Sequence, residues 1–155
     1  RIMKEPFHGS ISEMKNRLAN AKNVLFLADN AGEIIFDTLL LRHLDVANIT
    51  VAVRGAPILN DATMDDARVA GLHTIARVIS NGSDAPGTIL DDCSDEFREV
   101  FNNADVIIAK GQGNYESLCD LSRDIFFLLK IKCEYLAHHC GFEIGTHTII
   151  RTGRP

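Results

Sequence analysis

The stretch Val24-Leu25-Phe26-Leu27-Ala28-Asp29-Asn30-Ala31-Gly32-Glu33 decides the fold of this chain. Its apolar first half predicts a buried strand, and an acid and an amide follow before a turn of small residues and an amphipathic segment. In an open α/β sheet, ligands bind at the carboxyl ends of the strands. Asp29 and Asn30 therefore stand where a metal ion or a phosphate would be bound.

Strand and helix patterns alternate along the rest of the chain. The periodicity predicts helices over 10–21, 32–43, 62–70, 95–102 and 133–140, and strands over 23–28, 49–54, 76–80, 104–109, 124–132 and 146–150, the last at a sheet edge. This alternation predicts an α/β fold with a parallel or mostly parallel sheet and helices on both faces. Right-handed crossovers would bring the carboxyl ends of the strands to one edge.

Composition limits the classes of partner. The chain has 155 residues with 46% hydrophobic and 24% charged residues, as in a globular protein of one domain. Its net charge of -5 argues against a nucleic-acid partner, since phosphate backbones are bound by basic surfaces. No apolar run reaches the roughly 18 residues of a membrane span. The four cysteines show no CxxC spacing, which favours a reduced, cytoplasmic location.

The chain opens on Arg1 rather than on an initiator methionine, so we expect a fragment or a processed form of a longer protein. We divide it into an N-terminal helical segment, residues 1–22, and an α/β domain, residues 23–155. The sequence does not indicate an oligomeric state.

A second acid-amide pair, Asn60-Asp61, follows the next predicted strand. Taken alone, each pair is explained at least as well by helix capping. Together, they bring two carboxylates to the same edge of the sheet, where these would repel each other without a cation. We therefore predict that Asp29, Asn30 and Asp61 bind a divalent metal ion through oxygen ligands.

The segment Lys110-Gly111-Gln112-Gly113-Asn114-Tyr115-Glu116 follows a strand and opens a helix. In such a position, free backbone N–H groups can cradle a phosphate, and glycines allow a close approach. The segment is no dinucleotide fingerprint, because Glu116 stands at the third glycine position. A tight turn explains it equally well. Lys132, after an apolar strand, is either a charge for phosphate or a residue whose stem covers the edge.

Two other chemistries are disfavoured. A zinc site would need Cys133, His138, His139 and Cys140, but adjacent residues rarely bind one tetrahedral ion. An aspartyl-phosphate mechanism would need a second acid two residues after Asp29, where Ala31 stands.

Five motifs together carry a family resemblance. LADNAGEIIFD, VRGAPILNDAT, SNGSDAPGT, AKGQGNYESL and FFLLKIKC resemble, in the same order, the metal-dependent damage-control phosphatases, also called ARMT-like and formerly a domain of unknown function. The resemblance extends from about Asn23 to Gly145 and is strongest to the stand-alone, mostly archaeal branch.

The resemblance implies a Rossmann-like three-layer α/β/α sandwich and a phosphatase that uses a divalent ion (Mn, Mg, Co or Ni). Its substrates would be small phosphorylated metabolites, such as sugar phosphates or phosphopantetheine-like compounds, damaged ones included. Position by position, it implies a catalytic and metal-binding set, Asp29, Asn30 and Asp61, of which the two acids would be catalytic. It also implies substrate and phosphate contacts from Gln112, Gly113, Asn114, Tyr115, Glu116 and Lys132.

Members of this family carry a helical lobe before the α/β domain, where this chain has only residues 1–22. Two other functions therefore stay open. One is a non-catalytic module that binds a phosphate or a nucleotide. The other is a carboxyl methyltransferase that uses S-adenosylmethionine, a label that the family has also carried.

Overall fold

The computed structural model describes residues 5–44 and 48–153, so residues 1–4, 45–47 and 154–155 of the two predicted segments lie outside the described residues. The strands are β1 (Phe7–His8), β2 (Asn23–Leu27), β3 (Asn48–Val53), β4 (Arg77–Ser80), β5 (Val106–Lys110), β6 (Ile125–Lys130) and β7 (His147–Arg151). The helices are α1 (Ile11–Ala19), α2 (Ile34–Arg42), α3 (Met64–Val69), α4 (Asp95–Asn103), α5 (Gly111–Leu118) and α6 (Glu134–Cys140), with short 3₁₀ turns at Leu72–Thr74 and Leu90–Asp92.

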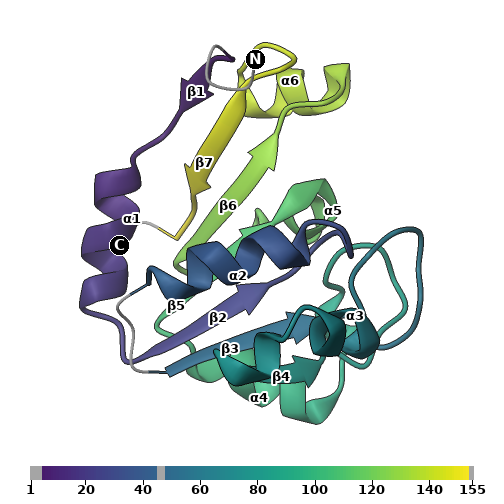
Figure 1. Ribbon diagram of the computed structural model, residues 1–155. Coiled ribbons are helices and arrows are strands. Elements are labelled where there is room, and N and C mark those ends of the chain that lie inside the picture. The colour runs from purple at the N-terminus through teal and green to yellow at the C-terminus, as the bar shows by residue number, and fades with distance from the viewer. Residues whose placement is uncertain (1–4, 45–47, 154–155) are drawn as a thin grey trace.

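One mostly parallel sheet organises the molecule (Figure 1). Its strand order is β1-β7-β6-β5-β2-β3-β4, and among these neighbours only β6 and β7 pair antiparallel. The chain runs from β2 outward through β3 to β4 and then returns to the other side of β2 as β5. The sheet therefore has a topological switch point between β2 and β5, the place where open α/β sheets form a ligand crevice.

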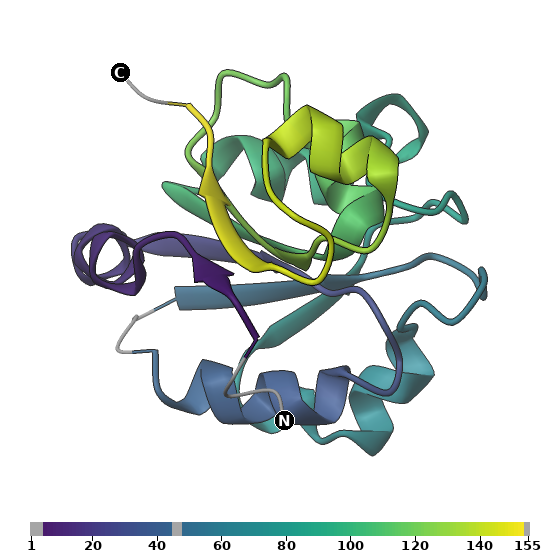
Figure 2. The ribbon, with the colours of Figure 1, turned by 90° about the horizontal axis from the view of Figure 1, so that it is seen from above.

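Helices cover both faces of the sheet (Figure 2). Leu25 and Leu27 of β2 join α4, α5 and α6 in one buried cluster, whereas Val24 and Phe26 join α1, α2 and α3 in another. This alternation follows from the two-residue period of a strand. The three-layer α/β/α sandwich that the sequence predicts is confirmed.

One expectation about the sheet is wrong. The strand predicted over 146–150 is not at the edge, because β1 pairs with the outer side of β7, with Phe7 opposite His147 and His8 opposite Thr148. A two-residue strand has no periodicity to detect, and its pairing depends on the tertiary fold.

The described helices include none with both the length and the apolar character that crossing a membrane requires.

Candidate functional site

The two acid-amide pairs meet at the carboxyl end of the sheet, beside the switch point. The backbone N–H of Ala31 donates to the carbonyl of Asn60 at 2.9 Å, and that of Ala62 donates to the carbonyl of Asp29 at 2.7 Å. Asn30 and Asp61 form an antiparallel bridge between the two loops. Two segments that are about thirty residues apart in the chain are thus held together by their own backbone.

Neither acid serves as a helix cap. The N-cap position of α2 is Glu33, without a side-chain hydrogen bond, and α3 is capped by Thr63, which forms a capping box with Asp66. The capping interpretation of Asp29 and Asp61 is therefore wrong. The position of the two acids at this edge of the sheet therefore has to be explained by the groups that surround them.

Asp29 lies in a concentration of negative charge. Burial, the carboxylate of Asp61 and the carboxylate of Glu33 together raise the pKa of Asp29 to about 6, although Arg54 and Lys110 oppose them. Within residues 5–44 and 48–153, its side chain receives one hydrogen bond, from Asn30 Nδ2 to Asp29 Oδ2 at 2.8 Å. Asn60 Nδ2 in turn donates to Asn30 Oδ1. Carboxylate and amide oxygens gathered in this way are the donors that hard divalent cations prefer.

Gly111, the first residue of α5, packs directly against Asp29. Its φ of +81° lies in the left-handed region, and a Cβ at this position would collide with the Asp29 carboxylate. Glycine is therefore required here on two counts. The start of α5 after β5 and the acid after β2 are in contact across the switch point.

Lys110, which opens the predicted segment without being among its predicted contacts, completes this contact. Lys110 Nζ donates to Glu33 Oε2 at 3.0 Å and to Asp37 Oδ1 at 2.9 Å. Although burial works against its charged form, Asp37 and Glu33 keep the pKa of Lys110 above its usual range. The other oxygen of Asp37, Oδ2, is buried without a hydrogen bond from the described residues, and burial raises the pKa of this acid. The ammonium of Lys110 is thus fixed at the rim of the site.

A cavity of about 410 Å³ opens beside these groups. Its lining includes two acids, four basic side chains and apolar residues of β6 and β7: Asp29, Glu33, Lys110, Lys130, Lys132, His147, Leu128, Leu129 and Ile149. Lys130 and His147 both donate to Glu5 Oε2, at 2.7 and 2.6 Å. Lys132 forms no ion pair with any residue in the described part of the chain. It therefore keeps its charge available to an anion that shares the cavity with Asp29.

Asp61 is held from behind by Arg54. Arg54 Nε donates to Asp61 Oδ2 at 2.7 Å, and the two side chains are only 4% and 8% exposed. Arg54 is a site residue missing from the predicted set. Its place at the end of an apolar strand, directly before Gly55, is the signal that could have identified it as a buried charge at the same edge.

The predicted phosphate-binding residues 112–116 are not among the described residues that line this cavity, to which α5 contributes Gly111. Asn114 is fully buried and bonds to Arg54, and Tyr115 packs edge-on against Phe127 in the core. Gln112, which is half-buried, donates to the exposed Glu116 at 2.7 Å. Gly113 lies against Gly87. The structure thus brings Asn30 and Asp61 next to Asp29 and places Lys132 in the same cavity as Asp29, whereas the side chains of Asn114 and Tyr115 point into the protein.

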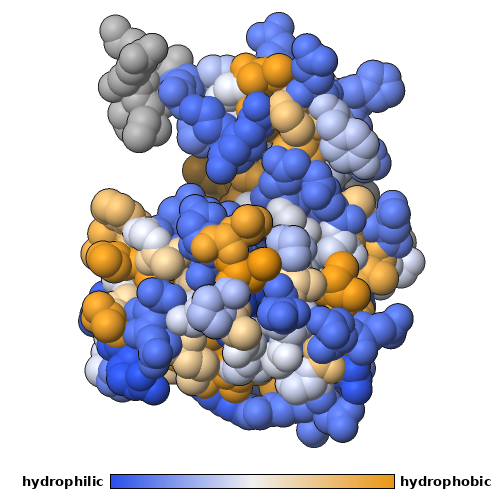
Figure 3. All heavy atoms as spheres, turned by 90° about the vertical axis from the view of Figure 1, so that its right-hand side faces the viewer, coloured by the Kyte–Doolittle hydropathy of each residue, from blue (hydrophilic) through white to orange (hydrophobic). Residues whose placement is uncertain are grey.

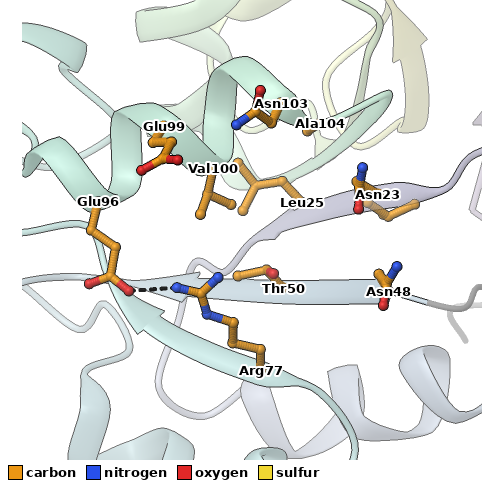
Figure 4. A pocket seen from close by; sticks show the side chains of 11 residues that line it. Asn23, Leu25, Asn48, Thr50, Arg77, Glu96, Glu99, Val100, Asn103 and Ala104 are labelled. Carbon is orange, nitrogen blue, oxygen red and sulfur yellow. Dashed lines mark hydrogen bonds and ion pairs between the residues drawn. The ribbon is translucent and has the colours of Figure 1, made fainter.

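A separate hollow of about 590 Å³ lies at the opposite, amino end of the strands (Figure 4). It is lined by polar side chains from β2, β3, β4 and α4, including Asn23, Asn48 and the ion pair Arg77–Glu96. In α/β sheets this end serves stability rather than ligand binding. We therefore assign the functional site to the carboxyl end.

The four residues of the alternative zinc site do not form one. Within residues 5–44 and 48–153, no three His, Cys, Asp or Glu side chains are placed to share a metal ion. The set Asp29, Asn30 and Asp61 has two acids and an amide, and so is of a different kind.

The side of the molecule toward which β2 and β3 point is mainly hydrophilic, with separate hydrophobic groups (Figure 3).

Known proteins resemble this chain over most of its length. The family model described as the damage-control phosphatase ARMT1-like domain matches residues 3–148. The chain is 45% identical over 143 residues to a damage-control phosphatase of Pyrococcus horikoshii, a match that covers 90% of this chain and 50% of that protein. It is 45% identical over 138 residues to a damage-control phosphatase of Archaeoglobus fulgidus, covering 86% and 48%.

An uncharacterized protein of Methanocaldococcus jannaschii is 43% identical over 147 residues, covering 91% of this chain and 48% of that protein. Among solved structures, the crystal structure of a DUF89 family protein from Pyrococcus horikoshii superposes with a TM-score of 0.86 at 43% identity, covering 90% of this chain and 50% of that one. The chain thus spans about half the length of the curated relatives that it matches.

Proposed function

Because the chain belongs to the family of damage-control phosphatase ARMT1-like domains, we propose that it hydrolyses phosphomonoesters of small metabolites with a divalent metal ion. The family membership confirms the resemblance that the five motifs predict. The observation that carries the proposal is the meeting of Asp29 and Asp61 at the switch point, beside a cavity that also contains Lys132.

The charges of the site fit a divalent cation. Burial and the acidic neighbours raise the pKa of Asp29 to about 6, so nearby positive charge does not fully balance its carboxylate. A cation would supply the missing positive charge. Asp29, Asn30 and Asp61 would hold the ion. The nitrogen of the Asn30 amide faces Asp29, and a half-turn of the amide would present its oxygen instead. When bound, such an ion polarises a phosphoryl oxygen and lowers the pKa of a bound water.

The remaining groups act on the phosphate and its position. Lys132 lines the same cavity as Asp29 and would offset the negative charge of a phosphoryl group, whereas the charge of Lys110 is balanced by Glu33 and Asp37. The free N–H groups at the start of α5 add the positive end of a helix dipole next to Asp29. The polar groups of the cavity would thus position the phosphate near the ion that the two acids would hold. Positioning and electrostatic stabilisation supply most of the catalysis of phosphoryl transfer.

Phosphate release tests this proposal. The chain is stripped of metal with a chelator and assayed on an aryl phosphate and on a panel of phosphorylated metabolites with Mg²⁺, Mn²⁺, Co²⁺ or Ni²⁺. We expect turnover with at least one ion and its loss in Asp29→Asn and Asp61→Asn. Asp65→Asn is the matched control, because Asp65 is exposed and pairs only with Arg68 among the described residues.

Two outcomes would contradict the proposal. Binding of phosphorylated compounds without turnover in any ion would identify a non-catalytic module. Binding of S-adenosylmethionine that a chelator does not affect would favour the methyltransferase.

A further inference from the structure

Arg54 is a buried cation that uses all three of its nitrogen atoms. Nε donates to Asp61 Oδ2 at 2.7 Å, Nη1 to Thr88 Oγ1 at 3.3 Å, and Nη2 to Asn114 Oδ1 at 3.2 Å. A buried ion pair rarely gains stability over apolar residues of the same size, so its presence calls for another reason. Its 4% exposure also keeps its guanidinium from touching a substrate.

The partners of Arg54 are themselves fixed by further hydrogen bonds. Thr88 Oγ1 donates to Asn114 Oδ1 at 2.8 Å. Asn114 Nδ2 donates to the carbonyl of Ala28, directly after β2, at 3.3 Å and to that of Lys110, the last residue of β5, at 2.8 Å. Arg54 is thereby tied to both strands that border the switch point.

The loop 81–88, whose motif the phosphatase proposal leaves without a role, holds Thr88 in place. The N–H of Thr88 donates to Ser117 Oγ of α5 at 2.9 Å. Gly87 packs so closely on Gly113 that a Cβ would collide with its carbonyl oxygen. The loop is therefore pressed against α5, and the Thr88 hydroxyl has little freedom.

The result is an aspartate with one oxygen fixed and one available. Arg54 binds Oδ2 of Asp61, and the backbone of its neighbour Ala62 is bonded to Asp29. Oδ1 of Asp61 accepts no hydrogen bond from any residue that the structure describes. This oxygen is the one that remains for a ligand shared with Asp29.

We propose that Arg54, supported by Thr88 and Asn114, is the positioning residue that orients Asp61 for metal binding. The proposal rests on the proposed function. Groups that orient a metal ligand in this way typically contribute about 10–100-fold in metal affinity. Arg54→Lys should weaken Mn²⁺ binding within that range, because lysine is a point charge that cannot reach three partners in one plane.

A pair of substitutions at Thr88 separates positioning from folding, because both leave Arg54 in place. Thr88→Val keeps the shape but removes the hydroxyl, whereas Thr88→Ser keeps the hydroxyl. We expect about a tenfold loss of Mn²⁺ affinity in Thr88→Val and most of the affinity restored in Thr88→Ser. Arg77→Lys is the control for arginine in general, since Arg77 pairs with Glu96 at the opposite end of the sheet (Figure 4).

The readout is calorimetric titration of the metal-free chain with Mn²⁺, with circular dichroism to verify folding. Kinetics at saturating Mn²⁺ should show a lower kcat and an unchanged KM for the phosphate ester in Thr88→Val. If wild type binds Mn²⁺ and releases phosphate but Thr88→Val and Thr88→Ser behave alike, the positioning role is overturned and the function stands. If wild type neither binds Mn²⁺ nor turns over, the proposed function fails, and the positioning role fails with it.

Discussion

At the scale of single residues, the site contains an acid whose ionised form destabilises the folded protein. Asp29 is a partly buried acid beside Asp61 and Glu33, and its surroundings disfavour the charge that a metal ligand needs. Residues selected for packing alone would not be arranged in this way, which is why perturbed acids in a crevice point to function.

This cost predicts a pH-dependent effect of Asp29→Asn. A carboxyl group whose pKa in the folded state is raised to about 6 destabilises the fold only when it is ionised, so its penalty is small near pH 4, grows as the pH rises toward 6 and is fully present above 6. We expect Asp29→Asn to stabilise the metal-free protein at pH 7.5 by about 1–2 kcal/mol, after allowance for partial exposure. Urea unfolding in a chelator at pH 4 and pH 7.5 measures it. An equal difference at both pH values would contradict the assignment.

Gly111 predicts a second effect at this scale. Gly111→Ala combines a φ of +81° with a collision with the Asp29 carboxylate. We expect a loss of more than about 1 kcal/mol in stability and of about 100-fold in phosphate release, since small displacements of a catalytic group are costly. Gly141→Ala is the control, because Gly141 has a φ of +74° but a Cβ added there would meet no neighbouring group of the described residues within 4 Å. Equal activities of the two variants would show that the contact with Asp29 is unimportant.

At the scale of elements, one ion cluster attaches α1 to the sheet. Asp124, which precedes β6, forms ion pairs with Arg151 of β7 at 2.7 Å and with Arg17 of α1 at 2.5 Å. Arg151 also pairs with Glu13 of α1 at 2.7 Å. Burial alone would raise the pKa of Asp124, but the hydrogen bonds from Arg151 and Arg17 lower it. The cluster connects the antiparallel strand β7 to an otherwise parallel sheet.

We therefore predict that Asp124→Asn loses about 1–3 kcal/mol of stability at pH 7. Because the pKa is lowered in the folded state, this contribution is present above the ordinary pKa of about 4 and disappears as the pH falls through the lower, folded value. Urea unfolding between pH 7 and pH 2.5 should show the two proteins converging. Asp65→Asn, which breaks an exposed pair with Arg68, should have little effect at any pH.

The elements also show how far the sequence alone reaches. Every strand with a clear apolar run was predictable, and so was the edge to which Asp29 and Asp61 are delivered. The two-residue β1 and the antiparallel direction of β7 were not, because neither leaves a periodic pattern. Arg54 and Lys110 were not predicted as site residues, because their roles depend on contacts with residues far along the chain, Asn114 and Asp37.

At the scale of the whole molecule, the sheet separates two cores. Adjacent residues of β5 point to opposite faces: Ile107 belongs to the cluster under α4, α5 and α6, and Ile108 to the cluster under α2 and α3. Leu25, opposite Ile107 in register, shares its face. The sheet thus separates the two hydrophobic cores and also positions the residues of the site at its carboxyl end.

This separation predicts a pattern of additivity. Ile107→Val and Ile108→Val should each cost about 0.5–1.5 kcal/mol, and the double variant should lose the sum within about 0.5 kcal/mol because the two side chains share no packing partners. Ile107→Val with Leu25→Val should depart from the sum, because these side chains are in one cluster. Denaturant unfolding of the single and double variants measures both. Strong coupling between 107 and 108 would contradict two independent cores.

The pairing of β1 with β7 has a consequence for behaviour at high concentration. The sheet ends in a strand of two residues on one side, where Gly9 lets the chain cross over Ile149, and in the four-residue β4, which begins with a charged arginine, on the other. Short or charged borders offer few open hydrogen-bonding groups to a strand from another molecule. The architecture thereby resists fibril growth by sheet extension, and removal of the Phe7–His8 pairing would uncover β7 as a template for it.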